Sequence, residues 1–457
     1  MSSREYSIGN RQSTMDDVLI IGGGFAGLAA GVALAGAGRR VRLLEQKPHL
    51  GGRARSFVHA PTGAVVDNGQ HLLMGCYHAT LRFLKEIGTL DRVAVQPRLK
   101  MQFLEAPGRL TTLDCPNLPS PWHVLAGVAR SDSFSWREKR EILRLGRAVE
   151  KGPSEGGGLA QLTVEEWLAR LGQSERLRRG FWDLISIAAL NEDPRRASAA
   201  IFQRVLRLAL FASPADSCLA VPSRGLSDCY TAAAHDYITA RGGRVEFSRS
   251  VAGLVVAEGA CRSVRLADGS AVEAETVISA VPWYEFVQIV PGELLREEPY
   301  FTNILALRPA PIISINLWCD RAITDVDFVG LRGTTIQWLF NRGKITGGDN
   351  HCYSLVLSGA HEHISRSKEE LLALARKDLA ELLPEGRAAE VLHSLIIKER
   401  FATFSPCVGV DPLRPAAKSP VRGLYLAGDW TATGLPATIE GAVQSGYTAA
   451  QAVLATE

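Results

Sequence analysis

The stretch VLIIGGGFAGLAAGVALAGAGRRVRLLE, residues 18–45, decides the fold of this chain. It opens with four apolar residues, the pattern of a short strand buried in a parallel sheet. A G-x-G-x-x-G turn, an alanine-rich helical segment ending near Gly38 and a second apolar strand follow, and that strand leads directly into Glu45. Strand, glycine turn, helix, strand and acid in this order are typical of a βαβ unit that binds a dinucleotide.

The glycines and the acid of this unit have separate roles. Gly22 permits the tight turn, Gly24 lets the backbone approach a pyrophosphate, and Gly27 allows close packing of helix on strand. The helix start offers free amides to phosphate, and an acid at Glu45 favours an unphosphorylated ribose. Because the whole context is present, we favour this interpretation over a glycine turn without a ligand. The predicted contacts are Gly22, Gly24, Phe25, Ala26, Gly27 and Glu45.

The segment LGGRA, residues 50–54, distinguishes between the possible dinucleotides. It resembles a segment that continues along the dinucleotide in many flavoproteins with two dinucleotide folds, where its arginine lies near the phosphates. A simple nicotinamide-dependent dehydrogenase does not need such a segment. The segment therefore indicates FAD in contact with Gly52, Arg53 and Ala54; the alternative is that Arg53 is a solvated surface charge.

The chain returns to a glycine-punctuated polar segment near its end, LYLAGDWTATGLPATIEGA at residues 424–442. Together with the N-terminal unit it resembles the FAD-dependent amine oxidase and phytoene desaturase superfamily, in which this segment closes over the flavin. The resemblance implies that Gly428 and Asp429 bond the ribityl or pyrophosphate portion. It also implies that the helix starting at Pro436, Ala437 and Thr438 points its amides at the ring, where a helix N-terminus stabilises negative charge.

Four segments narrow the resemblance to the hydroxysqualene dehydroxylases. They are DNGQH (67–71), LNEDPRRASAA (190–200), ERFATFSP (399–406) and AGDWTATGLPATIEGAVQSGYTAA (427–450). In one respect the sequence departs from the pattern, because Glu192 and Asp193 are acidic where more neutral residues are expected. The resemblance implies Gly69 and Gln70 beside the flavin ring, and Val251 with its backbone against the adenine.

The implied activity is an FAD-dependent oxidoreductase of hopanoid and squalene biosynthesis that reductively removes the hydroxyl of hydroxysqualene, a thirty-carbon isoprenoid. An external electron donor must then reduce the flavin again. Two alternatives stay open. A desaturase of the phytoene type would run the hydride in the other direction, and a prenyl-binding escort protein would share the fold without redox chemistry, although it would not need the flavin-closing segment.

Composition sets limits on other functions. The 457 residues carry a net charge of +3, too small a basic field to indicate a nucleic-acid partner. Eight scattered cysteines without a CxxC pair predict reduced thiols, no metal site and no covalent flavin link, because none lies in the expected flavin-facing segments. Without a membrane-spanning run or a signal peptide, we expect a cytoplasmic protein that touches the membrane's inner face peripherally.

The fold class expected is α/β, a two-dinucleotide-binding-domain flavoprotein whose Rossmann-like FAD domain carries an inserted α+β substrate domain. Residues 1–14 are interpreted as a disordered leader. The FAD domain is predicted to be discontinuous, at 15–78, 215–290 and 405–457. Three short strands with glycine turns, SVAGLVVAEG, CRSVRLADGS and AVEAETVISA, predict a meander within its second part. The substrate and membrane-associating domain is then 79–214, mostly helical, and 291–404, a mixed sheet with one helix. Thr163 and Glu166 have the spacing of a capping box at the start of one of these helices. Segments 118–129 and 201–214 are candidates for contact with the bilayer, and a buried helix is the alternative for the second.

Candidate catalytic and substrate contacts follow from the same resemblance. His71 could protonate the departing hydroxyl, or it could hold the DNGQH turn by a structural hydrogen bond. Asp67 is expected to order that turn. Lys398 lies where amine oxidases use a lysine, but a solvated lysine is the plainer interpretation. Four aromatic residues could line a polyene pocket or could be plain core: Trp182, Phe211, Trp283 and Trp338.

Overall fold

The computed structural model describes residues 17–152, 158–348 and 351–456. The expected leader, residues 1–14, lies outside them. A five-stranded parallel sheet forms the centre of the nucleotide-binding domain, in the order β10-β2-β1-β14-β20. Its strands come from three distant stretches of the chain: β1 (Val18–Ile21), β2 (Val41–Leu44), β10 (Arg244–Glu246), β14 (Val277–Ser279) and β20 (Leu424–Leu426).

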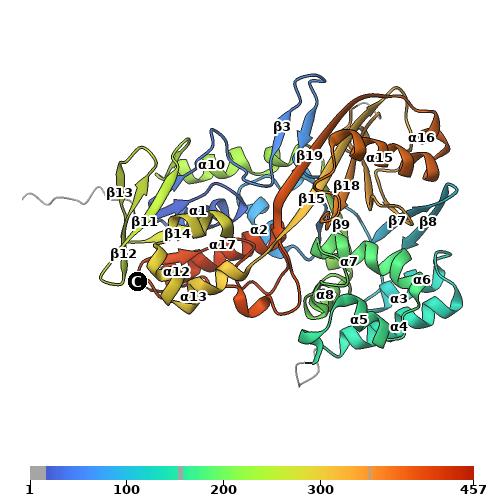
Figure 1. Cartoon of the computed structure of the whole chain (residues 1–457), viewed down its shortest axis with the longest axis horizontal. Helices are drawn as coiled ribbons and strands as arrows, with labels where there is room; N and C mark the ends of the chain where they lie inside the picture. Colours follow the sequence, from blue (N-terminus) through green and yellow to red (C-terminus); the bar gives the residue numbers. More distant parts are fainter. Residues whose placement is uncertain (1–16, 153–157, 349–350, 457) are drawn as a thin grey trace, which may run out of the picture.

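Small residues let the helices of this domain approach one another closely. Helix α1 (Phe25–Gly36) packs against α10 (Thr231–Thr239) and against α17 (Ile439–Leu454), which ends the chain. A Cβ on Gly27 would stand 1.9 Å from the Gly22 carbonyl oxygen, and a Cβ on Gly446 would stand 2.2 Å from that of Ala26. The predicted three-stranded meander follows as β11 (Val251–Ala257), β12 (Ala260–Leu266) and β13 (Ala271–Glu273) (Figure 1).

A seven-stranded mixed sheet forms the second domain, in the order β19-β15-β18-β17-β16-β7-β8. Five of its strands come from the later insertion: β15 (Pro309–Cys319), β16 (Phe328–Leu331), β17 (Trp338–Asn341), β18 (Cys352–Ser358) and β19 (Val391–Phe404). Because side chains alternate along a strand, Ile313, Ile315 and Leu317 of β15 pack under α15 (Lys368–Leu382). The opposite face of the sheet, with Ile312 and Val356, faces a cavity.

The earlier insertion is mostly helical, as predicted for 79–214, but it also contains strands that were not predicted. It contains β6 (Val93–Val95) and the hairpin β7 (Lys100–Glu105) and β8 (Arg109–Asp114), which extends the seven-stranded sheet. The strand β16 pairs with β7 in parallel, so the two insertions share one sheet. The period-2 alternation of KMQFLE and RLTTLD about a Pro-Gly turn was the signal for this hairpin.

The helical layer of the first insertion follows the hairpin (Figure 1). Its main helices are α3 (Trp122–Arg130), α4 (Trp136–Glu150), α5 (Val164–Arg170), α7 (Asp183–Leu190) and α8 (Ala199–Leu206), and the π-helical turn η4 (Arg207–Phe211) follows α8. Thr163 and Glu166 form the predicted capping box of α5. In this part of the chain no helix has the length and apolar character needed to cross a membrane, and the same holds for the rest of the described residues.

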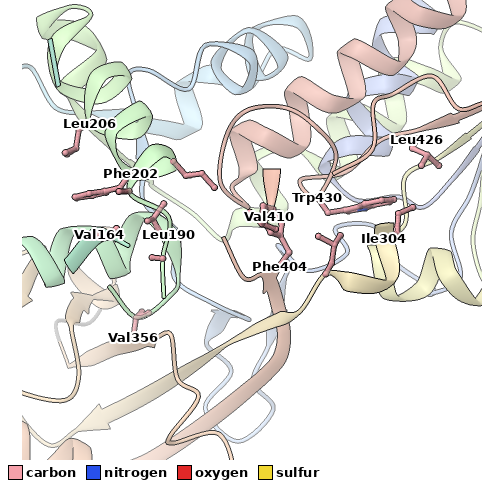
Figure 2. Close-up of a cluster of buried hydrophobic side chains, with 14 of the residues drawn as sticks. Val164, Leu190, Phe202, Leu206, Ile304, Val356, Phe404, Val410, Leu426 and Trp430 are labelled. Atoms are coloured by element: carbon pink, nitrogen blue, oxygen red, sulfur yellow. The ribbon is translucent and has the colours of Figure 1, made fainter. Parts of the chain in front are cut away.

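One hydrophobic core connects the helical layer to the nucleotide-binding domain. Figure 2 shows Val164, Phe202 and Leu206 on one side of this cluster and Trp430 on the other. Leu206 is only 2% exposed. Helix α8 is therefore a buried helix, which is the alternative given above for this part of 201–214.

Candidate active site

A cavity of about 1600 Å³ runs from the glycine turn of the nucleotide-binding domain to the face of the seven-stranded sheet and the helical layer. Ligand pockets usually measure about 300–1,000 Å³. The cavity is therefore large enough for a dinucleotide and a second molecule. All the predicted cofactor contacts line it except Gly27, which packs behind the turn: Gly22, Gly24, Phe25, Ala26, Glu45, Gly52, Arg53, Ala54, Gly69, Gln70, Val251, Gly428, Asp429, Pro436, Ala437 and Thr438.

The nucleotide end of the cavity has the features that a pyrophosphate requires. Gly22 has a φ of +104°, which favours glycine, and a Cβ on Gly24 would meet no atom within 4 Å. Helix α1 begins without a side-chain cap, so its first amides are free for a ligand. Glu45 is buried and accepts the amides of Gly23 and Lys47, each at 2.8 Å. Each carboxylate oxygen keeps a lone pair for a ribose hydroxyl.

Arg53 connects three segments at this wall. Its guanidinium pairs with Asp429 and donates a hydrogen bond to the Ala402 carbonyl at 2.9 Å. Burial opposes the charge of Arg53, but the Asp429 carboxylate raises its pKa above the ordinary value. Arg53 is thus part of the cavity wall, not a solvated surface charge, and it joins the GGR segment to the closing segment and to β19.

The closing segment is held by hydrogen bonds at both ends. Gly428, with a φ of +141°, donates its amide to Ser445 Oγ at 2.7 Å. Thr438 caps α17 by accepting the Gly441 amide at 3.0 Å. In the first turn of α17, Glu440 reaches across the cavity wall and caps α2 (His78–Glu86). Sequence reasoning missed this role of Glu440, which no local pattern signals because its partners are about 360 residues away.

The DNGQH segment runs along the cavity. Asp67 accepts hydrogen bonds from Ser56 Oγ at 2.6 Å and from the Leu226 amide at 3.0 Å, and its second oxygen lies 3.5 Å from Arg342. Asp67 therefore orders this region through distant partners. The side-chain amide of Gln70 and Nδ1 of His71 are buried in the cavity wall, and neither has a hydrogen-bond partner among the described residues.

Burial lowers the pKa of His71 below its ordinary value, although the Asp67 charge opposes this shift. The imidazole is consequently neutral at neutral pH. The Gly69 backbone of the same turn contacts the imidazole, whereas Nδ1 has no hydrogen-bond partner among the described residues, and the side chain lines the cavity. His71 is therefore a candidate acid whose protonated form becomes populated only when the pH falls below the ordinary pKa of a histidine.

The far end of the cavity is apolar. Trp182 and Trp338 line it, whereas Phe211 and Trp283 do not: Phe211 packs against Gly146, and Trp283 packs against Tyr284 and Phe401. Trp182 donates to Gln173 at 3.0 Å, but the Trp338 indole nitrogen is buried without a partner among the residues that the structure describes. Other apolar lining residues were not predicted: Leu99, Met101, Leu113, Val124, Val128, Ile142, Phe181, Ile185, Leu206, Leu208, Leu210, Ile312, Phe340 and Val356.

Three other residues noted in the sequence lie outside the cavity lining. Lys398 donates to the Arg366 carbonyl. Glu192 is fully buried, with Ser405 and His361 as partners. Asp193 pairs with Arg195 at the surface. The acidic departure from the family pattern is therefore structural, because these carboxylates hold the helical layer instead of facing the cavity.

Residues 25–454 match the family of flavin containing amine oxidoreductases, and the chain belongs to that family. Its relatives include the hydroxysqualene dehydroxylase of Rhodopseudomonas palustris, 29% identical over 96% of this chain and 98% of the relative. They also include the 15-cis-phytoene desaturase of Synechococcus elongatus, 27% identical over 96% of both chains.

Solved structures agree with this assignment at the level of fold. An oxidoreductase from Methanosarcina mazei covers 96% of this chain and all of its own, with a TM-score of 0.74 at 17% identity. A putrescine oxidase variant has a TM-score of 0.72 at 17% identity, covering 96% and 99%. The predicted fold class and membership are confirmed, and the chain is a flavin-dependent oxidoreductase, not a binding protein without redox chemistry.

Proposed function

We propose that this enzyme binds FAD non-covalently and reductively removes the hydroxyl group of hydroxysqualene to give squalene. The observation that carries the proposal is the composition of the cavity. An apolar chamber, continuous with the dinucleotide site, has a few buried polar atoms without partners in its wall. Such a chamber suits a long hydrocarbon that carries one hydroxyl group. The relatives named hydroxysqualene dehydroxylase support this substrate.

The wall residues fit FAD. The open space over Gly24, the uncapped start of α1 and the buried Glu45 suit the adenosine and pyrophosphate portions. Gln70 and the start of α17 suit the polar edge of the ring. Cys76, which lies outside the segments expected to face the flavin, also lines the cavity. Burial raises the pKa of its thiol to about 12, so the reactive thiolate is scarce and a covalent link is disfavoured.

In the reaction, the C–O bond breaks, a C–H bond forms and the hydroxyl leaves as water. Reduced flavin, when bound, supplies the hydride, and an external two-electron donor restores it. His71 delivers the proton to the departing oxygen, and the Trp338 indole donates a hydrogen bond within the chamber. The apolar side chains orient the isoprenoid and exclude water from the reacting carbon.

A desaturase of phytoene type is the competing function, because relatives with that name match the chain about as well. A pure hydrocarbon offers no partner to the His71 imidazole or the Trp338 indole. Leaving a buried polar group unpaired costs about 1–3 kcal/mol. The unpaired atoms therefore favour a substrate with a hydroxyl group over phytoene.

The direct test is anaerobic incubation of the purified protein with a reductant and hydroxysqualene, with squalene measured by mass spectrometry. Denaturation of the same preparation should release all of the yellow chromophore as FAD. Flavin that stays on the polypeptide would contradict the non-covalent site. A desaturated product from phytoene with oxidised flavin, and no squalene, would establish the competing function.

For His71, the change His71→Ala should slow turnover per bound flavin by about 10²–10⁴-fold, the usual share of general acid catalysis. Because the pKa of His71 is lowered, wild-type activity should rise as the pH falls below about 6.5. The variant should lose this dependence while keeping its FAD content. A normal rate per flavin with reduced FAD occupancy would instead assign His71 a purely structural role.

A further inference from the structure

Large apolar side chains are exposed at the edge of the helical layer, close to the apolar end of the cavity. Trp122, at the start of α3, is 62% exposed, and Trp136, at the start of α4, is 80% exposed. Leu118, just before α3, and Leu143 of α4 are exposed as well. Isolated exposed leucines are ordinary, but two tryptophans and two leucines on neighbouring helices form a patch.

The arrangement of these residues is set by α3, α4 and η4, which pack together. Trp136, Arg140, Leu143 and Arg147 follow one another at helical spacing, so they lie along one exposed stripe of α4. Gly146, on α4, packs against Phe211 of η4, and Ser120 Oγ donates to the Phe211 carbonyl at 2.9 Å. The segment that carries Leu118 and Trp122 therefore contacts η4 close to Gly146, in the C-terminal half of α4. We call Leu118, Trp122, Trp136, Arg140, Leu143 and Arg147 the α4 face.

The charges on this face have one sign. The acids Glu138 and Glu141 of α4 are buried, and they serve a capping box and the Ser174 amide. Arg140 and Arg147 are the exposed charges of the α4 face, and Glu150, in the last turn of α4, is an exposed acid that follows them. Tryptophan and leucine among arginines is the composition of a helix lying in the interface of a bilayer with anionic lipids.

The apolar end of the cavity lies next to this face. Leu208 of η4 lines the apolar end of the cavity and is 40% exposed. Val124 also lines the cavity and lies two residues after Trp122. Only a lipid phase holds a long hydrocarbon at useful concentration, because its transfer to water costs about 0.8 kcal/mol for each CH₂.

We propose that the α4 face docks on an anionic bilayer and that the opening at Leu208 takes the isoprenoid directly from it. The contact is thus made by α3, α4 and η4, whereas α8 is buried. The route of entry rests on the proposed function, because it requires an apolar substrate; the docking itself does not.

Docking is tested on the flavin-loaded protein with vesicles of phosphatidylcholine, with and without phosphatidylglycerol, and no substrate. The wild-type protein should co-sediment with the anionic vesicles and be released by salt. The double change Arg140→Glu and Arg147→Glu should lower this binding by at least about tenfold, since each basic residue near the surface contributes roughly fivefold. Trp122→Ser with Trp136→Ser should weaken binding to both kinds of vesicle.

The matched control is Arg262→Glu with Arg265→Glu, an equal change of charge at exposed positions of β12, the middle strand of the meander at the other end of the molecule (Figure 1). It should leave vesicle binding unchanged, and the flavin spectrum should stay normal in all variants. Equal loss in the control, or wild-type protein that binds no vesicles, would overturn the docking. Single-stranded RNA that displaces the protein from vesicles would reassign the face to a polyanion.

Entry of the substrate is tested separately with hydroxysqualene. The double arginine variant should turn over detergent-dispersed substrate at the wild-type rate and lose most of its activity on substrate embedded in anionic vesicles. An equal loss in both preparations would overturn the entry route. No turnover by the wild-type protein in either preparation, with vesicle binding intact, would refute the proposed function and leave the docking face in place.

Discussion

The carboxylate of Glu45, which directly follows β2, connects the end of that strand to the glycine turn of the nucleotide site. Its two oxygens hold the amides of Gly23 and Lys47, so the side chain orders both the glycine turn and the chain beyond β2. At the same time it lines the cavity. A single acid thus fixes the shape of the dinucleotide site and leaves lone pairs for a ribose.

Replacing Glu45 with Gln should weaken FAD binding by about 1–3 kcal/mol, because a charged acceptor is lost and an amide NH₂ is directed at a backbone amide. Isothermal titration of the apoprotein with FAD measures the change. Glu246→Gln is a suitable control, since Glu246 pairs with Arg42 on the neighbouring strand and does not line the cavity. Equal FAD affinity in Glu45→Gln and the wild type would remove Glu45 from the site.

At the scale of elements, α17 does more than close the cofactor site. Helix α2 starts at His78 without a side-chain cap from its own N-cap residue. Glu440, in the first turn of α17, accepts the amides of Ala79 and Thr80 at 2.9 Å each. The last helix of the chain therefore caps one of the first, and both meet at the cavity.

Glu440→Ala should lower the free energy of unfolding by about 1–2 kcal/mol, the cost of losing a helix cap. It should also loosen the cavity wall, so that FAD dissociates faster. Urea unfolding and the rate of flavin release measure the two effects, and Glu440→Gln should retain part of both. Unaltered stability in the alanine variant would contradict the capping role.

At the scale of the whole molecule, the two domains share one core and one cavity. The sheet of the second domain takes strands from both insertions, and the core in Figure 2 continues from the helical layer to Trp430. Several histidines are buried or half-buried in this assembly. Burial lowers the pKa values of His71, His123 and His363 below the ordinary range.

Stability should therefore fall as the solution becomes acidic. Below a pH of about 6.5 these histidines bind protons in the unfolded chain but not yet in the folded protein, because their pKa values are lower in the folded state. The free energy of unfolding therefore decreases as the pH falls. The stabilisation is fully present above that pH and is lost as the pH falls through the lowered pKa values. Urea unfolding at pH 7.5 and 5.5 checks this, and His123→Gln should reduce the difference. A difference that His123→Gln leaves unchanged would exclude His123 from it.

Local patterns in the sequence predicted several features whose signal lies within a short segment. The βαβ unit at 18–45, the capping box at Thr163 and the meander after Val251 all depend on neighbouring residues, because turn chemistry and periodicity are local. The closing segment at 424–442 was identified by resemblance. The β7–β8 hairpin also had a local signal in the alternation of KMQFLE, but it was not predicted.

Only the tertiary structure decided which distant residues meet. It brings Arg53 and Asp429 together as an ion pair and places Asp67 beside Arg342. It also places the carboxylate of Glu440 at the start of α2. It also separated Trp182 and Trp338, which line the chamber, from Phe211 and Trp283, which do not. The sequence alone does not distinguish the pocket-lining residues among these four aromatic residues, because each is large and apolar. Which of them borders the cavity depends on how sheet and helices pack, and that packing is fixed by contacts between segments hundreds of residues apart.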